Sequence, residues 1–334
     1  MQEAAIYIMP EIEAPAVTII RLLDANMHVV KDDLSLAELV VTQAWYDREL
    51  LKKPDAQVTV ALDRCDDQKI GFSGNTRRRT AYLHVDVWAV DKPEQGVVGR
   101  GMREKTCAEV NRIIREKRTK PNETDYDFVG IGQTTGTHKA YEAGSNSEPA
   151  PNDLLWSELD NAEYEELWYS DDNRFTKSVN VASQYALMLF RFKIESDDKV
   201  VKQIVLKFEG YGTAPSGNGV TIRVWNFTAS AWQNAATGTG EADESVAITL
   251  VSALTDFIDS NGYVYLLAKT TNPSDGATPV VLHCDYAECS VTVEGVTYCD
   301  VVSYRDQDMT NVKPFVWHTE FTVKAWLFEN VPQT

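Results

Sequence analysis

Long apolar runs, paired cysteines and clustered histidines are all missing from this sequence. No stretch approaches the ~20 consecutive apolar residues of a membrane-spanning helix, so we expect no membrane partner. Five cysteines are present, but no C-x-x-C pair occurs, which argues against a zinc cluster and against a dense disulfide framework. Cys284, Cys289 and Cys299 are close enough in sequence for one strand-to-strand bridge; reduced, buried thiols are the alternative.

Recognisable catalytic motifs are also missing. None of the five histidines lies at a metal-ligand spacing from another, and Gly130-Ile-Gly-Gln is not a phosphate-binding loop. No serine, histidine and acid set forms a hydrolase motif. We therefore expect a protein that is not an enzyme and that needs no cofactor.

Positive charge is scarce, and the deficit is local. The chain holds 32 Lys and Arg against 50 Asp and Glu, a net charge of −18. Residues 131–297 carry 10 basic and 23 acidic side chains, a net charge of −13, whereas 1–130 and 298–334 together carry only −5. A strongly acidic surface repels nucleic acid and anionic membranes, so we expect the middle of the chain to bind neither.

What is present is a mixed first segment followed by an all-β pattern. Residues 15–23 and 99–118 show helical periodicity, and 57–63 and 79–90 alternate as strands. Residues 131–153 are rich in Gly, Pro, Ser, Thr and Asn, which predicts a linker. Beyond it, short alternating segments separated by turn clusters predict a β-sandwich of jelly-roll type.

The end of the chain holds a long alternating strand at 317–328. The sandwich already has enough strands without it, whereas the first segment has too few to bury both faces of a sheet. We therefore expect 298–334 to return to the first domain, with 318–328 pairing in the same sheet as 80–90.

The predicted fold class is α+β. A small mixed α/β domain, with an antiparallel sheet plus helices, is expected to comprise 1–130 and 298–334. The linker at 131–153 leads into an inserted all-β sandwich at 154–297. Such insertions succeed where the ends of a loop lie close together at a surface.

The order helix, strand, strand, helix and strand pair in the first domain resembles the tail-terminator (tail-completion) proteins of long-tailed phages. The resemblance is carried by the strands at 54–62 and 81–90, the helix at 101–117, and Tyr304-Arg-Asp before the final alternating strand. The sandwich departs from the short family form and would be an outward decoration.

This resemblance implies a virion structural protein at the head-proximal end of the tail. The chain would form a homo-hexameric ring that caps the tail tube, with the tail tube protein and the neck or connector protein as partners. Two alternatives stay open. One is a neck or head–tail connector protein, and the other, from a different class, is a glycan-binding or adhesion protein of a cell or virion surface.

Five arginines are candidates for the ring interface or its lumen. Arg77, Arg78 and Arg79 form the sharpest basic run, and Arg112 and Arg115 lie in the helix at 99–118. A place in the lumen would allow non-specific contact with passing DNA, because phosphate contact needs only positive charge. The alternatives are a solvated face or ion pairs with nearby acids.

Three aromatic residues of the sandwich are candidates for a sugar-stacking platform: Tyr211, Trp225 and Trp232. Their flat rings combine an apolar face with a polar tip. The alternative is that they belong to the core.

Three acids of the sandwich are candidates for a structural calcium site: Asp171, Asp172 and Asp285. They lie near its opening and closing strands, and Ca²⁺ takes carboxylate oxygens as ligands. The alternative is that they are ordinary loop acids, and no other metal site is predicted.

Overall fold

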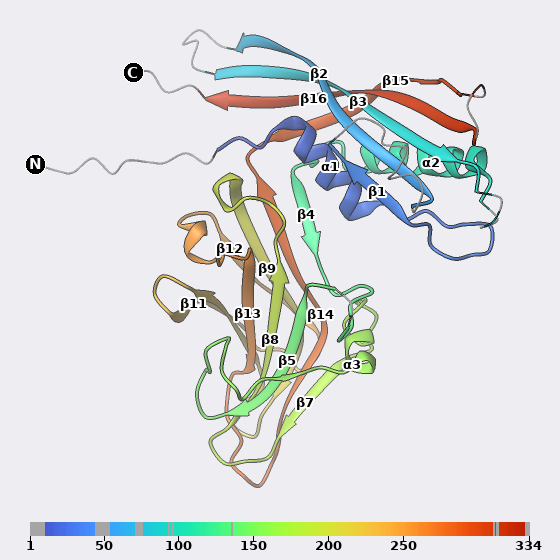
Figure 1. The fold of residues 1–334 in the computed structure, drawn as a ribbon. Coiled ribbons are helices and arrows are strands. Elements are labelled where there is room, and N and C mark those ends of the chain that lie inside the picture. The colour runs from blue at the N-terminus through green and yellow to red at the C-terminus, as the bar shows by residue number, and fades with distance from the viewer. Residues whose placement is uncertain are drawn as a thin grey trace, which may run out of the picture. The chain divides into compact units, whose positions relative to one another are not determined.

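The computed structural model describes residues 11–43, 54–70, 76–92, 94, 97–134, 136–309, 311 and 314–330 (Figure 1). The chain divides into two compact units. One, here called the discontinuous unit, comprises Glu11–Thr124 and Glu294–Thr334; the other, the sandwich unit, contains Asp125–Val293. Each unit has its own principal hydrophobic core, and the two cores share no residue.

The discontinuous unit is built on one sheet, here called sheet C, with the strand order β1-β2-β3-β16-β15. β1 runs parallel to β2, and the other pairs are antiparallel. The bounds are β1 (Leu39–Thr42), β2 (Ala56–Ile70), β3 (Thr76–Val90), β15 (Val296–Asp306) and β16 (Val316–Asn330).

β16 lies beside β3 over its whole length, from Val316 opposite Val90 to Asn330 opposite Thr76. The predicted pairing of 318–328 with 80–90 is therefore confirmed. The match follows from the alternation of both strands, because each has one apolar face that must be buried.

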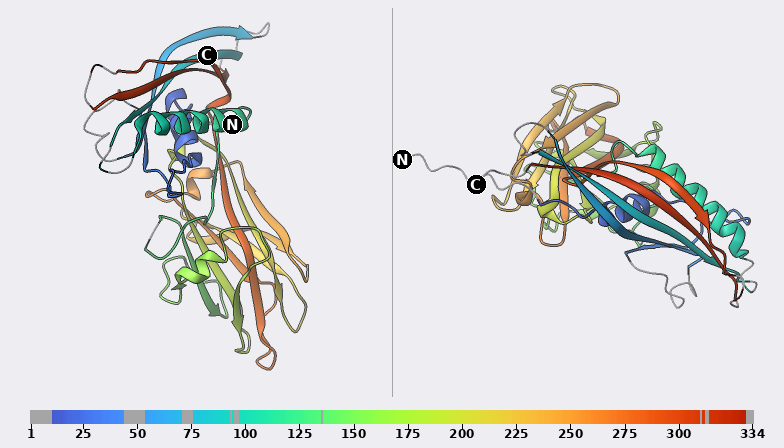
Figure 2. Two further views of the ribbon diagram at one scale, coloured as in Figure 1. Left: turned by 90° about the vertical axis from the view of Figure 1, so that its right-hand side faces the viewer. Right: turned by 90° about the horizontal axis from the view of Figure 1, so that it is seen from above.

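Two helices cover one face of sheet C. α1 (Pro15–Asn26) begins with proline in its first turn, where an amide hydrogen is not needed. α2 (Gly99–Glu116) buries Ile113 and Ile114 in the same core as Val85 of β3, and the two views of Figure 2 show it running along the sheet. Burying each such side chain contributes about 1.5–3 kcal/mol, so packing rather than helix propensity holds both helices in place.

The sandwich unit consists of two sheets. Sheet A has the order β11-β10-β13-β8-β5-β6, and sheet B has β12-β9-β14-β4, with β7 pairing to β14. The strands of sheet A are β5 (Lys139–Ser145), β6 (Ser157–Glu158), β8 (Tyr185–Lys193), β10 (Val220–Asn226), β11 (Ala231–Gly238) and β13 (Tyr263–Thr270). Those of sheet B are β4 (Glu123–Tyr126), β7 (Phe175–Val179), β9 (Val201–Thr213), β12 (Glu244–Leu250) and β14 (Val280–Val293). A short helix, α3 (Asn161–Glu165), begins with a capping box formed by Asp160 and Glu163.

Aromatic side chains fill the core between sheets A and B. Phe190 of β8 lies 5.8 Å from Phe128 and 6.1 Å from Phe208 of β9, measured between ring centroids. These separations are those at which aromatic pairs attract one another. Alternate residues along β8 and β9 point into this core, as the period of a strand requires.

The predicted α+β class is wrong. Strands make up 50% of the chain and helices 14%, so the protein is mainly β. The strand predicted at 57–63 continues as β2 to Ile70, and the segment 298–334 belongs to two long strands, β15 and β16. The expected small α/β domain is therefore a long-stranded sheet with helices on one face.

The predicted linker at 131–153 is also incorrect. β5 lies within it and pairs with β8 inside sheet A. The small residues that made this segment look like a loop fit its place in the sheet, since a Cβ at Gly144 would come within 3.0 Å of a methyl group of Val179. The sandwich unit accordingly runs from Asp125 to Val293 rather than from 154 to 297.

All five cysteines are free, so the alternative of a bridge among the last three is not realised. Burial raises the pKa of Cys299 to about 12 and that of Cys107 to about 11, which keeps both as thiols. No helix in the described part of the chain is long and apolar enough to cross a membrane.

Candidate functional site

The strands of sheet A carry a second set of side chains that point away from the core. On β8, Leu187, Leu189 and Arg191 alternate with Met188 and Phe190, which lie in the core. We call this surface the outer face of sheet A. It comprises Tyr141, Ala143, Tyr185, Leu187, Leu189, Arg191, Arg223, Trp225, Tyr263, Tyr265, Leu267 and Lys269, with Trp156 and Trp232 joining it at its edges.

Strand register determines which of these side chains are neighbours. One row across the sheet reads Arg223, Leu267, Leu189, Tyr141 and Glu158, each directly opposite the next. Because directly opposed residues have Cβ atoms about 4.5–5.5 Å apart, the row is continuous. It has charged ends and an apolar middle.

The centre of the outer face is an apolar strip beneath aromatic rings. Leu187, Leu189 and Leu267 are fully buried although they point away from the core. Half-buried aromatic side chains pack against them: Tyr141, Trp156, Tyr185, Trp225 and Tyr265. The accessible part of this surface is therefore largely aromatic.

The two tryptophans of the β10–β11 hairpin form a pair at one edge of the outer face. Trp225 and Trp232 lie opposite each other in the register, with centroids 5.1 Å apart and planes at 71°. Trp232 is buried, and its Nε1 donates to the carbonyl of Pro149 at 2.8 Å. Trp225 is half-buried and has no such anchor among the described contacts, so its ring is the one available to a ligand.

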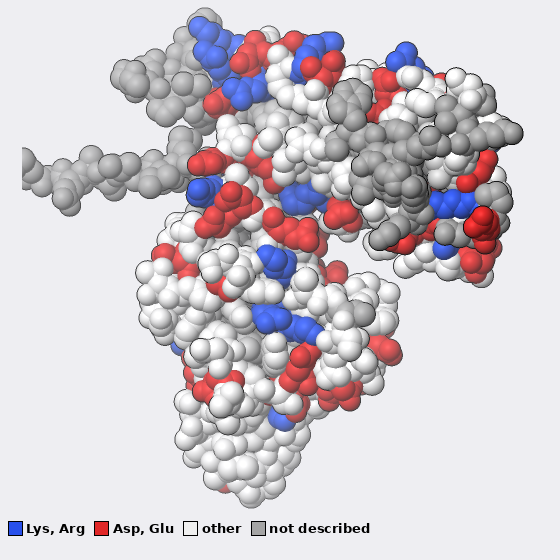
Figure 3. Space-filling model, in the orientation of Figure 1, with Lys and Arg blue, Asp and Glu red and all other residues white. Residues whose placement is uncertain are grey.

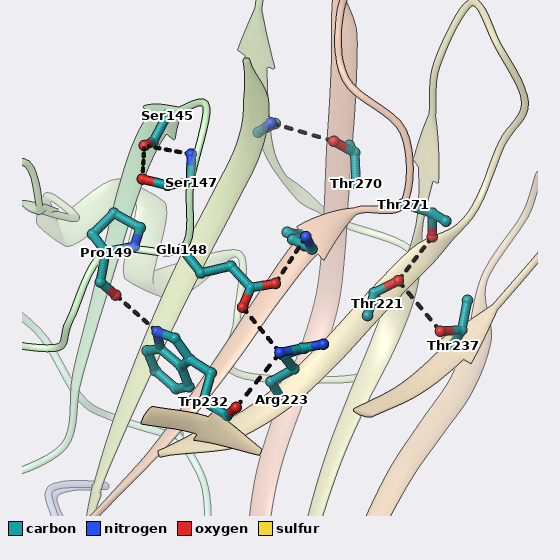
Figure 4. A network of polar contacts seen from close by, with 12 residues as sticks. Ser145, Ser147, Glu148, Pro149, Thr221, Arg223, Trp232, Thr237, Thr270 and Thr271 are labelled. Atoms are coloured by element: carbon teal, nitrogen blue, oxygen red, sulfur yellow. Dashed lines mark hydrogen bonds and ion pairs between the residues drawn. The ribbon is translucent and has the colours of Figure 1, made fainter. Parts of the chain in front are cut away.

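The segment after β5 folds back over this edge and brings an acid to it (Figure 4). Glu148 lies 3.2 Å from Arg223 Nη1 and 2.8 Å from Lys269 Nζ. Arg223 Nη1 also lies 3.5 Å from the carbonyl of Trp232. The same segment accepts the Trp156 indole N–H at the carbonyl of Ala150, 2.9 Å away.

Tyrosines and one arginine continue the outer face on the strands next to Trp225. The Arg191 guanidinium lies 4.6 Å above the Tyr263 ring, and Tyr265 lies directly opposite Arg191 in the register. Burial raises the pKa of Tyr141 and of Tyr265, so both phenols stay protonated and can donate hydrogen bonds.

The predicted sugar platform is brought together in part. Trp225 and Trp232 are neighbours on sheet A, whereas Tyr211 belongs to β9 in sheet B and stacks on His283 at 4.3 Å and 15°. The sequence prediction did not include Trp156 or the tyrosines of the outer face, Tyr141, Tyr185 and Tyr265. Their signal was present in β13, where aromatic residues occupy 263 and 265 while 264 and 266 are fully buried in the core.

The candidate calcium residues differ in their surroundings, and two of the three carboxylates are engaged with protein groups. Asp285 is 2% exposed, its Oδ1 has no hydrogen-bond partner, and burial raises its pKa. The Asp172 carboxylate pairs with Arg174 at 2.7 Å, and Asp171 accepts the amide of Asn173 at 3.0 Å. Within the described ranges, no three His, Cys, Asp or Glu side chains are grouped so that they could hold a metal ion.

The arginine run at the start of β3 is paired within its own sheet. Arg79 lies 3.0 Å from Asp67 and 2.9 Å from Glu329, and Arg77 lies 4.0 Å from Asp67. Arg78 donates to Gln68. In Figure 3, basic and acidic side chains are mixed at this end of sheet C.

The two helix arginines differ from one another. Arg112 bonds Glu109 and Glu116 on its own helix, at 2.7 and 2.5 Å, and Arg115 is exposed. The arginines therefore form ion pairs with nearby acids or lie exposed to solvent, as the alternative interpretation of the sequence expected. Whether the arginines also meet other copies of the chain or DNA stays a prediction, as do the hexameric ring and its tail and neck partners.

Comparisons with known proteins place a family match on the sandwich unit. Residues 135–293 match a family model described as the C-terminal domain of an uncharacterized protein. A search of curated proteins gave no match.

Three solved structures are similar at low identity. A xylan-binding module, CBM15, has 9% identity and a TM-score of 0.29, with 52% of this chain and 98% of that chain covered. The enzymatically active domain of tailspike protein 4 from bacteriophage CBA120 has 15% identity, a TM-score of 0.20 and coverages of 48% and 18%. A Stig cyclase, Fisc, from Fischerella sp. TAU has 10% identity, a TM-score of 0.20 and coverages of 52% and 87%. At these TM-scores the likenesses carry no conclusion about a ligand or an activity.

Proposed function

We propose that the sandwich unit binds a glycan on the outer face of sheet A. The observation that supports this proposal is the set of half-buried aromatic side chains on a sheet face that the core does not need. The core between sheets A and B is formed by the opposite side chains of the same strands. The outward aromatics are therefore free to serve another purpose.

The chemistry of the face matches that of a sugar. A pyranose ring has an apolar C–H face and a rim of hydroxyl groups, and binding sites for such mixed ligands combine apolar and aromatic walls with a few placed polar groups. Trp225, Tyr185 and Tyr265 supply flat surfaces. Glu148 and Arg191 supply an acceptor and a donor within the same face.

The geometry also suits a chain rather than a single sugar. Register places aromatic residues on four neighbouring strands: Tyr141 on β5, Tyr185 on β8, Tyr265 on β13 and Trp225 on β10. Strands lie about 4.8 Å apart, so Trp225, Tyr265 and Tyr141 are spread over roughly 15 Å across the sheet, and Tyr185 extends the set along β8, six residues from the Arg191 that faces Tyr265. This span is the length of a few sugar units, and binding without turnover is what an open face of this kind supports.

The test is affinity electrophoresis and calorimetry with a panel of neutral and acidic polysaccharides. Trp225→Ala removes the available indole and should weaken binding about tenfold or more, while Trp225→Phe keeps a ring and should retain most of the affinity. The matched control is Tyr211→Ala, which removes an aromatic from sheet B. If no glycan binds, or if the control variant loses binding as Trp225→Ala does, the proposal is wrong.

A further inference from the structure

Basic side chains are concentrated on the outer face of sheet A although the surrounding sequence is acidic. Residues 131–297 contain 10 basic and 23 acidic side chains. Five of these ten basic side chains lie on the outer face of sheet A: Lys139, Arg191, Lys193, Arg223 and Lys269. A positive surface on a negative unit indicates a negatively charged ligand, because charge complementarity guides recognition.

Most of these cations already have a partner on the protein. Lys139 lies 2.7 Å from Glu158, and Glu148 pairs with both Arg223 and Lys269. Together these three cations and two carboxylates carry a net charge of only +1. They can position sugar hydroxyls, but they leave little net charge for an anion.

Arg191 and Lys193 are different, since no carboxylate within the described ranges pairs with either; the Lys193 ammonium donates to the carbonyl of Asn261, whereas Arg191 has no such acceptor at its Nε. Its guanidinium lies over the Tyr263 ring, Tyr265 is its direct neighbour across the strand pair, and its Nε is buried without a hydrogen-bond acceptor. A half-buried guanidinium without a counter-ion loses hydration that the Tyr263 ring replaces only in part. The tyrosines fix its orientation in advance, which lowers the entropy lost when a ligand binds.

We propose that the outer face takes an acidic glycan, with the carboxylate of a uronic acid bound by Arg191 and its sugar ring packed on the neighbouring tyrosines. This inference rests on the proposed glycan-binding function. A guanidinium matches a carboxylate because two parallel N–H groups meet two oxygens. The adjacent phenols can donate to the remaining hydroxyls of the same sugar.

The experiment compares each of four polyuronates (polygalacturonate, alginate, hyaluronan and a glucuronate-bearing xylan) with its own carboxyl-reduced form. The intact chain should bind at least one acidic polymer about ten- to hundredfold more tightly than the reduced polymer, the range expected for one charge-assisted bidentate contact. Arg191→Gln should abolish this preference while leaving the weaker binding of the reduced form. Lys207→Gln, which removes a cation from sheet B, is the matched control and should keep the preference.

The outcomes separate the two proposals. Equal binding of acidic and reduced polymers, or a preference that survives Arg191→Gln, overturns the role of Arg191 while glycan binding stands. A preference lost equally in Lys207→Gln points to general charge attraction and also overturns it. Binding to none of these polymers or to the neutral panel overturns both proposals, and thermal melting of each variant identifies any that has failed to fold.

Discussion

Replacing Phe190 with alanine tests whether each unit is stable through its own core. Phe190 is 1% exposed and its ring packs against Phe128 and Phe208, so truncation leaves a cavity between sheets A and B. Phe→Ala substitutions in such cores cost about 3–5 kcal/mol. In a unit of this size each kcal/mol lowers the midpoint by about 2–4 °C, so the sandwich transition should fall by roughly 6–20 °C.

Scanning calorimetry of the whole chain is the assay, because it records each unfolding transition separately. We expect Phe190→Ala to move one transition and leave the other in place. The matched control is Ile113→Ala, since Ile113 is also 1% exposed but lies in the core beneath sheet C; it should move the other transition alone. If either substitution shifts both transitions together, the units unfold as one cooperative block and the argument from separate cores is refuted.

Two further substitutions probe polar groups of the sandwich unit, one half-buried and one fully buried. Burial lowers the pKa of His138 from 6.5 to about 4, and its neutral Nδ1 accepts the Lys193 amide at 3.0 Å. The unfolded chain therefore binds a proton that the folded chain does not, so stability should fall by up to roughly 3 kcal/mol as the pH drops from about 6.5 to about 4. His138→Gln should flatten this part of the curve in urea titrations, and parallel curves for both proteins would exclude His138 as the cause. Tyr164 is fully buried and its hydroxyl accepts the Ala140 amide at 2.9 Å; Tyr164→Phe should lower the free energy of unfolding by about 1–3 kcal/mol in the same titrations, and an unchanged midpoint would contradict this.

Elements with one apolar face could be predicted from the sequence. The helix expected at 99–118 is α2 (Gly99–Glu116), and the strand expected at 79–90 is β3 (Thr76–Val90). In both, polar residues on the opposite face made the period visible. The pairing of β16 with β3 followed for the same reason, since their alternations matched.

Elements without that contrast could not be predicted. β5 was hidden by its small residues, and β4 and β6 are too short to show a period. The candidate platform failed at Tyr211 because alternation along β9 shows which side chains point outward but not which sheet they belong to. Sheet membership depends on long-range pairing, which one sequence does not display.

The sequence did not predict the outer face of sheet A, because β8 carries apolar side chains on both of its faces. An antiparallel sheet with one face in a core usually turns a polar face to water. Here Leu187 and Leu189 are fully buried under aromatic rings on the far side from the core, although the core is complete without them. The aromatic rings that pack on these leucines leave their opposite faces accessible to a ligand. The polar side chains at the edges of the outer face determine which hydrogen-bonding groups that ligand needs. A ligand with flat apolar faces and a rim of hydroxyl groups meets both conditions, whereas a purely apolar surface would cover Arg191 and leave its buried Nε without a hydrogen-bond acceptor, at a cost of about 1–3 kcal/mol.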